Sequence, residues 1–71
     1  MEPTLSGLLQ QALTIAEARL TEVAMANRKL EAQMYINVTK KDVVEAAGQK
    51  VQMNNLVIVI IKLKESLWWL K

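Results

Sequence analysis

The side chains that most often carry out chemistry are scarce in this sequence of 71 residues. It contains no histidine and no cysteine, so it offers neither a base that titrates near neutral pH nor a thiolate nucleophile or soft metal ligand. Ser6 and Ser66 have no evident activating partner, and the two glycines, Gly7 and Gly48, form no phosphate-binding loop. The seven acidic residues are scattered and lack the spacing of a calcium loop. We therefore expect no enzymatic activity, no metal site and no cofactor.

The basic residues are spread along the chain instead of forming a patch for nucleic acid. Nine lysines and arginines give a net charge of +2, and only Arg28-Lys29 and Lys40-Lys41 are adjacent cationic pairs. Nucleic-acid binders concentrate Lys and Arg on one face, often with aromatic residues between them. The charge pattern therefore argues against nucleic acid as a partner.

Neither a secretion signal nor a membrane span is visible. Residues 1–3 lack a basic start followed by an apolar run. The longest uncharged stretch of the second half, residues 51–61, is interrupted by three polar side chains, whereas a span needs about 20 apolar residues. We expect no signal peptide and no transmembrane helix, and by default a cytoplasmic or particle-associated protein.

A chain this short needs a further source of stability beyond its own core, because a small protein buries a smaller fraction of its surface on folding than a large one does. Disulfides are excluded without cysteine, and a structural metal has no ligand set. Hydrophobic residues nevertheless make up 52% of the sequence, with no phenylalanine, a composition rich in aliphatic residues and alanine that is typical of helices. We therefore expect oligomerisation.

A heptad pattern predicts a long N-terminal helix. Apolar residues recur at alternate spacings of four and three, the pattern of a helix that packs along one seam. Asn27 is the one polar member, and a buried asparagine at such a position often fixes register; the alternative is an exposed Asn27 in a less regular bundle. Alanines beside the seam favour three or more helices in contact, from several chains or from one chain folding back. The predicted oligomer seam comprises Leu9, Leu13, Ala16, Leu20, Val23, Asn27, Leu30 and Met34.

A break is predicted at residues 35–39, which divides the chain into segments 1–36 and 37–71. Four of these five residues are β-branched or aromatic, which lowers helix propensity. Thr39 followed by Asp42 resembles a capping box, and Val38 and Val43 stand where a hydrophobic staple would close. We predict a helix start at Thr39 and a bent or hairpin arrangement. The rival is one uninterrupted rod, because a heptad column of mostly apolar residues continues through the break to residue 58.

The second segment combines an aliphatic run with a helical polar pattern. Residues 56–61 are six consecutive aliphatic side chains, which on propensity alone indicate a buried strand. Gln52, Asn55, Lys62 and Ser66 recur at helical spacings and trace one polar stripe. We predict helix for residues 50–70, with a β-hairpin of residues 35–39 and 56–64 as the rival. Gly48 either ends a short preceding helix or lies inside a longer one.

Two adjacent tryptophans near the C-terminus indicate a surface for a partner. Neighbouring helical residues point about 100° apart, so Trp68 and Trp69 cannot both enter one narrow seam. Large aromatic side chains are typical anchors of interfaces; the alternative is that they close the protein's own core. The predicted docking residues are Ile58, Ile61, Leu67, Trp68, Trp69 and Leu70.

These patterns predict an all-α fold, an oligomeric coiled coil or helical bundle. The expected function is that of a non-enzymatic structural subunit that self-associates through helices within a larger assembly, such as a virion, tail or scaffold. Its partners would be further copies and other protein subunits. One alternative is an adaptor or regulatory peptide that binds one larger protein through its C-terminal helix. The other is a membrane-surface amphipathic protein, which Asn54, Asn55 and Glu65 disfavour.

Overall fold

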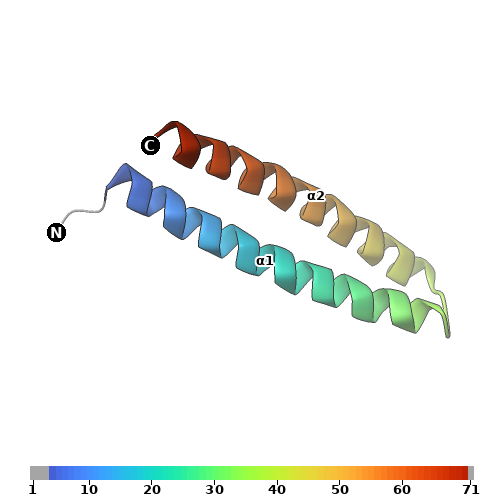
Figure 1. Ribbon diagram of the computed structural model, residues 1–71. Helices are drawn as coiled ribbons and strands as arrows, with labels where there is room; N and C mark the ends of the chain where they lie inside the picture. The colour runs from blue at the N-terminus through green and yellow to red at the C-terminus, as the bar shows by residue number, and fades with distance from the viewer. Residues whose placement is uncertain (1–3, 71) are drawn as a thin grey trace.

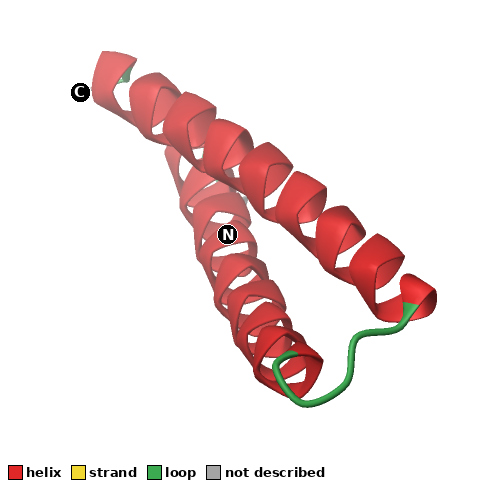
Figure 2. Cartoon of the chain, turned by 90° about the vertical axis from the view of Figure 1, so that its right-hand side faces the viewer, coloured by secondary structure: helices red, strands yellow, loops and turns green. Residues whose placement is uncertain are grey.

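The computed structural model describes residues 4–70, which form two long helices and one short connection. Helix α1 spans Leu5–Met34 and helix α2 spans Lys40–Trp69, each with 30 residues. The helices pack against each other as an antiparallel hairpin, with the start of α1 and the end of α2 at one end and the loop at the other (Figure 1). Figure 2 shows the loop bridging the two helix ends. The predicted all-α hairpin is confirmed, and the rival rod and β-hairpin are wrong.

Threonine hydroxyls cap the N-termini of both helices. The Gly7 amide donates to Thr4 Oγ1 at 3.0 Å, and the Asp42 amide donates to Thr39 Oγ1 at 3.1 Å. Each bond satisfies one of the amides that a first helical turn leaves unpaired. The helix start predicted at Thr39 is therefore confirmed, although the two valines of the expected staple are both exposed.

The connection forms because residues 35–39 favour helix poorly. α1 ends in a tightened turn, in which the Ile36 and Asn37 amides both donate to the Gln33 carbonyl oxygen, at 3.0 and 3.1 Å. Gly48 lies inside α2, and apart from its chain neighbours and the backbone of its own helix, no atom lies within 4 Å of the position that a Cβ would occupy. It is therefore tolerated within the helix and does not end one.

The predicted seam of α1 faces α2. All eight of its residues are buried or half-buried, with Ala16 and Asn27 the most buried, and α2 is the helix that α1 packs on. The seam is therefore filled within one chain.

A second seam on α2 completes the packing, and sequence analysis did not identify it. Its residues also alternate at spacings of four and three and are the only buried or half-buried residues of α2 in the described chain. They are Asp42, Ala46, Gln49, Met53, Leu56, Ile60, Leu63 and Leu67. In the sequence this seam is masked, because α2 carries apolar side chains on other faces as well.

The bond between Asn27 and Gln49 sets the register of the two seams. In an antiparallel pair, a step toward one end of α1 is matched by the opposite step along α2. Ala16 therefore lies at the level of Ile60, and both are buried. Such a small residue opposite a large one lets two helices approach closely.

Candidate interaction surfaces

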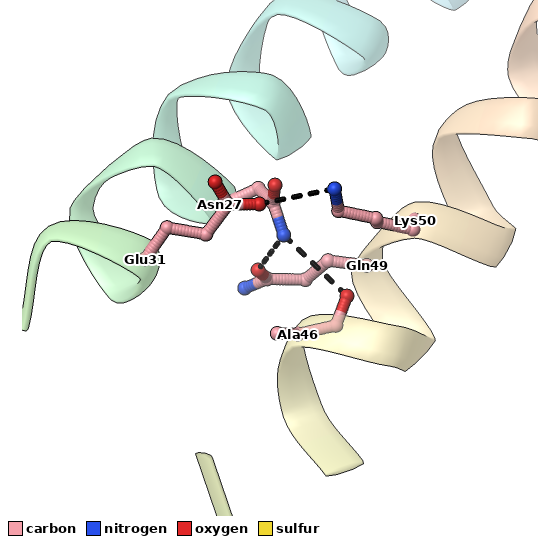
Figure 3. Close-up of polar contacts among 5 residues, drawn as sticks. All are labelled: Asn27, Glu31, Ala46, Gln49 and Lys50. Carbon is pink, nitrogen blue, oxygen red and sulfur yellow. Dashed lines mark hydrogen bonds and ion pairs between the residues drawn. The ribbon is translucent and has the colours of Figure 1, made fainter. Parts of the chain in front are cut away.

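A polar layer lies within the otherwise apolar contact between the helices. Asn27 is only 5% exposed, and its Nδ2 amide donates to Gln49 Oε1 at 3.0 Å and to the Ala46 carbonyl oxygen at 3.4 Å. Figure 3 shows the Asn27 side chain directed from α1 toward both acceptors on α2. Among residues 4–70, no buried side-chain nitrogen or oxygen lacks a hydrogen-bond partner. The buried amide is thus satisfied within the chain, at the seam position where sequence analysis singled it out.

An ion pair flanks this polar layer. Glu31 Oε1 of α1 lies 3.2 Å from Lys50 Nζ of α2, and both side chains are substantially exposed (Figure 3). Exposed ion pairs contribute about 0–1 kcal/mol to stability. The ion pair therefore contributes little to the free energy of folding. The buried hydrogen bond between Asn27 and Gln49 has the larger influence on which side chains of α1 and α2 face each other.

The acidic side chains of the described residues are dispersed, and the hollow between the two helices is shallow. The described residues contain no group of three or more Asp or Glu side chains that could hold a metal ion. The hollow of about 300 Å³ lies between the start of α1 and the end of α2. Lys64 is the one ionisable side chain among the residues that line it, so the hollow has no acid and base pair. What this part of the chain presents to other molecules is apolar surface.

The face of α2 turned away from α1 carries a second heptad repeat, here called the outer stripe. Its eight residues alternate at spacings of three and four, six of them are apolar, and all are exposed. On a helix, residues at these spacings share one face. The outer stripe consists of Val44, Ala47, Val51, Asn54, Ile58, Ile61, Glu65 and Trp68.

The predicted docking residues are divided between the two faces of α2. Leu67 is buried in the seam against α1. Ile58, Ile61 and Trp68 belong to the outer stripe, and Trp69 is exposed beside it. Leu70, the C-cap residue of α2, is half exposed, and with Trp68 it lines the hollow between the helices. Trp68 and Trp69 are 66% and 78% exposed and pack edge to face, with ring centroids 5.2 Å apart. The indoles therefore do not close the hairpin's own core.

Apolar side chains are also exposed elsewhere on the hairpin. Leu5, Leu8 and Ile15 lie along the first half of α1, at the same end of the hairpin as the tryptophans. Tyr35 and Ile36 project from the loop and are almost fully exposed. Over the described residues, neither helix is long and apolar enough to cross a membrane.

Comparisons of this chain with models of protein families, with curated proteins and with solved structures find no significant match.

Proposed function

We propose that this chain is a non-enzymatic helical subunit that self-associates and serves as a structural component of a larger protein assembly. The observation that carries the proposal is the large amount of apolar surface that the hairpin leaves uncovered. Apolar side chains remain exposed along almost the whole length of α2, from Val43 to Leu70. A helix that is apolar on several faces is typically enclosed by neighbours on several sides. In the hairpin α1 covers one side of α2. We therefore expect another chain to pack against the apolar side chains on the other side.

The shape of the hairpin supports the same conclusion. The Cα radius of gyration is 16.2 Å, whereas a compact chain of this length would have about 11 Å. The accessible surface is 5863 Å², against about 4,450 Å² for an ordinary folded monomer of this mass. One hairpin alone thus falls well short of the burial that folded monomers achieve.

Two copies suffice to reach ordinary compactness. A compact particle of twice the mass would expose about 7,400 Å². Two hairpins that reached this value would together bury about 4,300 Å², which lies within the range of about 2,000–5,000 Å² for obligate homodimers. A dimer is therefore the smallest assembly that the surface area supports.

Sedimentation over a range of chain concentrations, with circular dichroism on the same samples, tests this proposal. We expect a defined oligomer whose helix content and thermal midpoint rise with concentration, because association stabilises the folded chain. Tryptophan emission should shift to the blue as the oligomer forms, since both indoles are exposed in the single hairpin. A chain that stays monomeric and unfolds cooperatively at every concentration would contradict self-association.

A truncated chain that ends at Leu67 provides a second test. It retains the buried Leu67 but lacks Trp68 and Trp69, so the hairpin should persist while association weakens. Thr14→Ala is a matched control, because it alters an exposed side chain of α1 that bonds only its own helix backbone. It should leave the oligomer unchanged.

A further inference from the structure

We propose that a second copy of this chain docks antiparallel along the outer stripe of α2, with the two-fold axis passing between residues 55 and 57 of the two helices. This inference rests on the proposed self-association and adds its surface and geometry. α2 would then lie between α1 on one side and the second copy's α2 on the other.

Regular spacing along the outer stripe indicates that a helix covers it. The stripe keeps the three and four alternation over 25 residues, from Val44 to Trp68. This repeat lets side chains of one helix enter the gaps of another along a continuous contact. A lipid surface needs only an apolar face, and it would leave Asn54 and Glu65 within that face without partners. The observations therefore favour a helix over a bilayer.

Side-chain size along the stripe selects an antiparallel second copy. The first half carries small or medium side chains, Val44, Ala47, Val51 and Asn54, whereas the second half carries larger ones, Ile58, Ile61, Glu65 and Trp68. Antiparallel pairing brings each smaller residue to the level of a larger one, and large residues opposite small ones pack without voids. Parallel pairing would instead place the two Trp68 side chains at one level and leave gaps at the Ala47 level.

Polar residues in the stripe, and Asn55 beside it, are suitably placed in this register. Asn54 and Asn55 of both copies gather within about 6 Å along the axis, where amides can donate to and accept from one another. Glu65 lies at the level of the second copy's Ala47 and within one helical turn of its Lys50. It therefore provides the negative charge on a face whose flanks carry lysines at positions 41, 50, 62 and 64.

Antiparallel pairing also aligns the helix ends favourably. The partial positive charge at the start of one α2 lies beside the partial negative charge at the end of the other. On one flank, Lys41 comes within about 3 Å along the axis of the level of the second copy's Trp69, and an ammonium group is attracted to an indole face. Both interactions are absent from a parallel pair.

Single-cysteine variants test the geometry directly, because the chain has no cysteine of its own. Asn55 lies beside the proposed axis, so Asn55→Cys should form a disulfide-linked dimer under mild oxidation, since a disulfide needs Cα atoms within about 7 Å. Lys41→Cys is the matched control, on the same face two heptads away. In the antiparallel pair its two copies lie about 45 Å apart and should not cross-link. Equal cross-linking of both variants would overturn the antiparallel arrangement.

A charge substitution tests the surface independently. Ile58→Glu places a carboxylate in the middle of the outer stripe and should raise the dimer dissociation constant by more than about 100-fold, because both copies lose a buried isoleucine. Met25→Glu is the control, since Met25 is similarly exposed on α1. Far-ultraviolet circular dichroism should show intact helices in both variants at high concentration.

The remaining outcomes separate this inference from the proposed function. If Met25→Glu dissociates the oligomer and Ile58→Glu does not, the chain self-associates through α1 and only the interface assignment fails. If the unmodified chain is monomeric, both proposals fail. If tryptophan emission then shifts to the blue only with vesicles of phosphatidylcholine and phosphatidylglycerol, a lipid surface covers the stripe instead of a second copy.

Discussion

Replacing Asn27 with leucine should stabilise the hairpin, because the buried amide occupies a position that an apolar side chain could fill. Asn27 is 5% exposed, so a leucine there would be almost fully buried. Full burial of such a side chain is worth about 1.5–3 kcal/mol. The lost hydrogen bond to Gln49 costs about 0.5–1.5 kcal/mol net. Gln49 is only half-buried and can turn its amide to water.

The expected balance is a gain of about 1 kcal/mol in the free energy of unfolding. For a domain of this size it corresponds to a rise of about 4–8 °C in thermal midpoint. Leucine is bulkier than asparagine, and excess volume in a packed site costs about 1–3 kcal/mol. The hairpin has only two helices, which can separate slightly at this level, so we expect the burial term to prevail.

Gln49→Leu is the informative partner variant, and its effect should have the opposite sign. It leaves the Asn27 amide buried with only the Ala46 carbonyl oxygen at 3.4 Å. An incompletely satisfied buried donor costs about 1–3 kcal/mol. The double variant Asn27→Leu/Gln49→Leu removes both polar groups and should be at least as stable as Asn27→Leu. The two substitutions should therefore be non-additive.

Chemical denaturation followed by circular dichroism, at one fixed chain concentration, measures all four proteins. Sedimentation of the same samples reports whether removing the amide layer broadens the distribution of oligomers. The reasoning is refuted if Asn27→Leu lowers stability while Gln49→Leu is neutral. That outcome would mean that the two side chains do not share a buried layer.

Three further substitutions test the local physics of the hairpin. Thr39→Ala removes the cap of α2 and should lower the free energy of unfolding by about 0.5–2 kcal/mol, measured by thermal or chemical unfolding. The control Thr14→Ala should be neutral or slightly stabilising, because the Thr14 hydroxyl bonds only to a backbone carbonyl of its own helix. Gly48→Ala should stabilise α2 by about 1 kcal/mol, because the added Cβ meets no atom within 4 Å beyond its chain neighbours and its own helix backbone. A loss of stability would show that the site is enclosed in the assembled state. Glu31→Gln breaks the exposed ion pair with Lys50 and should change the free energy of unfolding by less than about 1 kcal/mol. A larger loss of stability would indicate that another chain buries the pair.

Local signals in the sequence were sufficient to identify α1, its seam and the start of α2. The spacing of Leu13, Leu20 and Asn27 defines one face of a helix whatever lies opposite it, and all three are buried or half-buried in the hairpin. Thr39 caps α2 through a bond that spans three residues. Such features depend only on neighbours in the chain. A pattern-based prediction can therefore recover them without any knowledge of the partner.

The face of α2 that packs on α1 was decided only in the tertiary structure. In sequence α2 carries two regular repeats, one through Ala46 and Ile60 and one through Val51 and Ile58, and periodicity alone does not rank them. The hairpin selects the first repeat, because it brings Gln49 to the buried amide of Asn27 and the large Ile60 to the level of the small Ala16. The second repeat is left facing outward. The local spacing of polar and apolar side chains was enough to predict both segments as helices, whereas the pairing of side chains between the two helices determined which surface remains exposed.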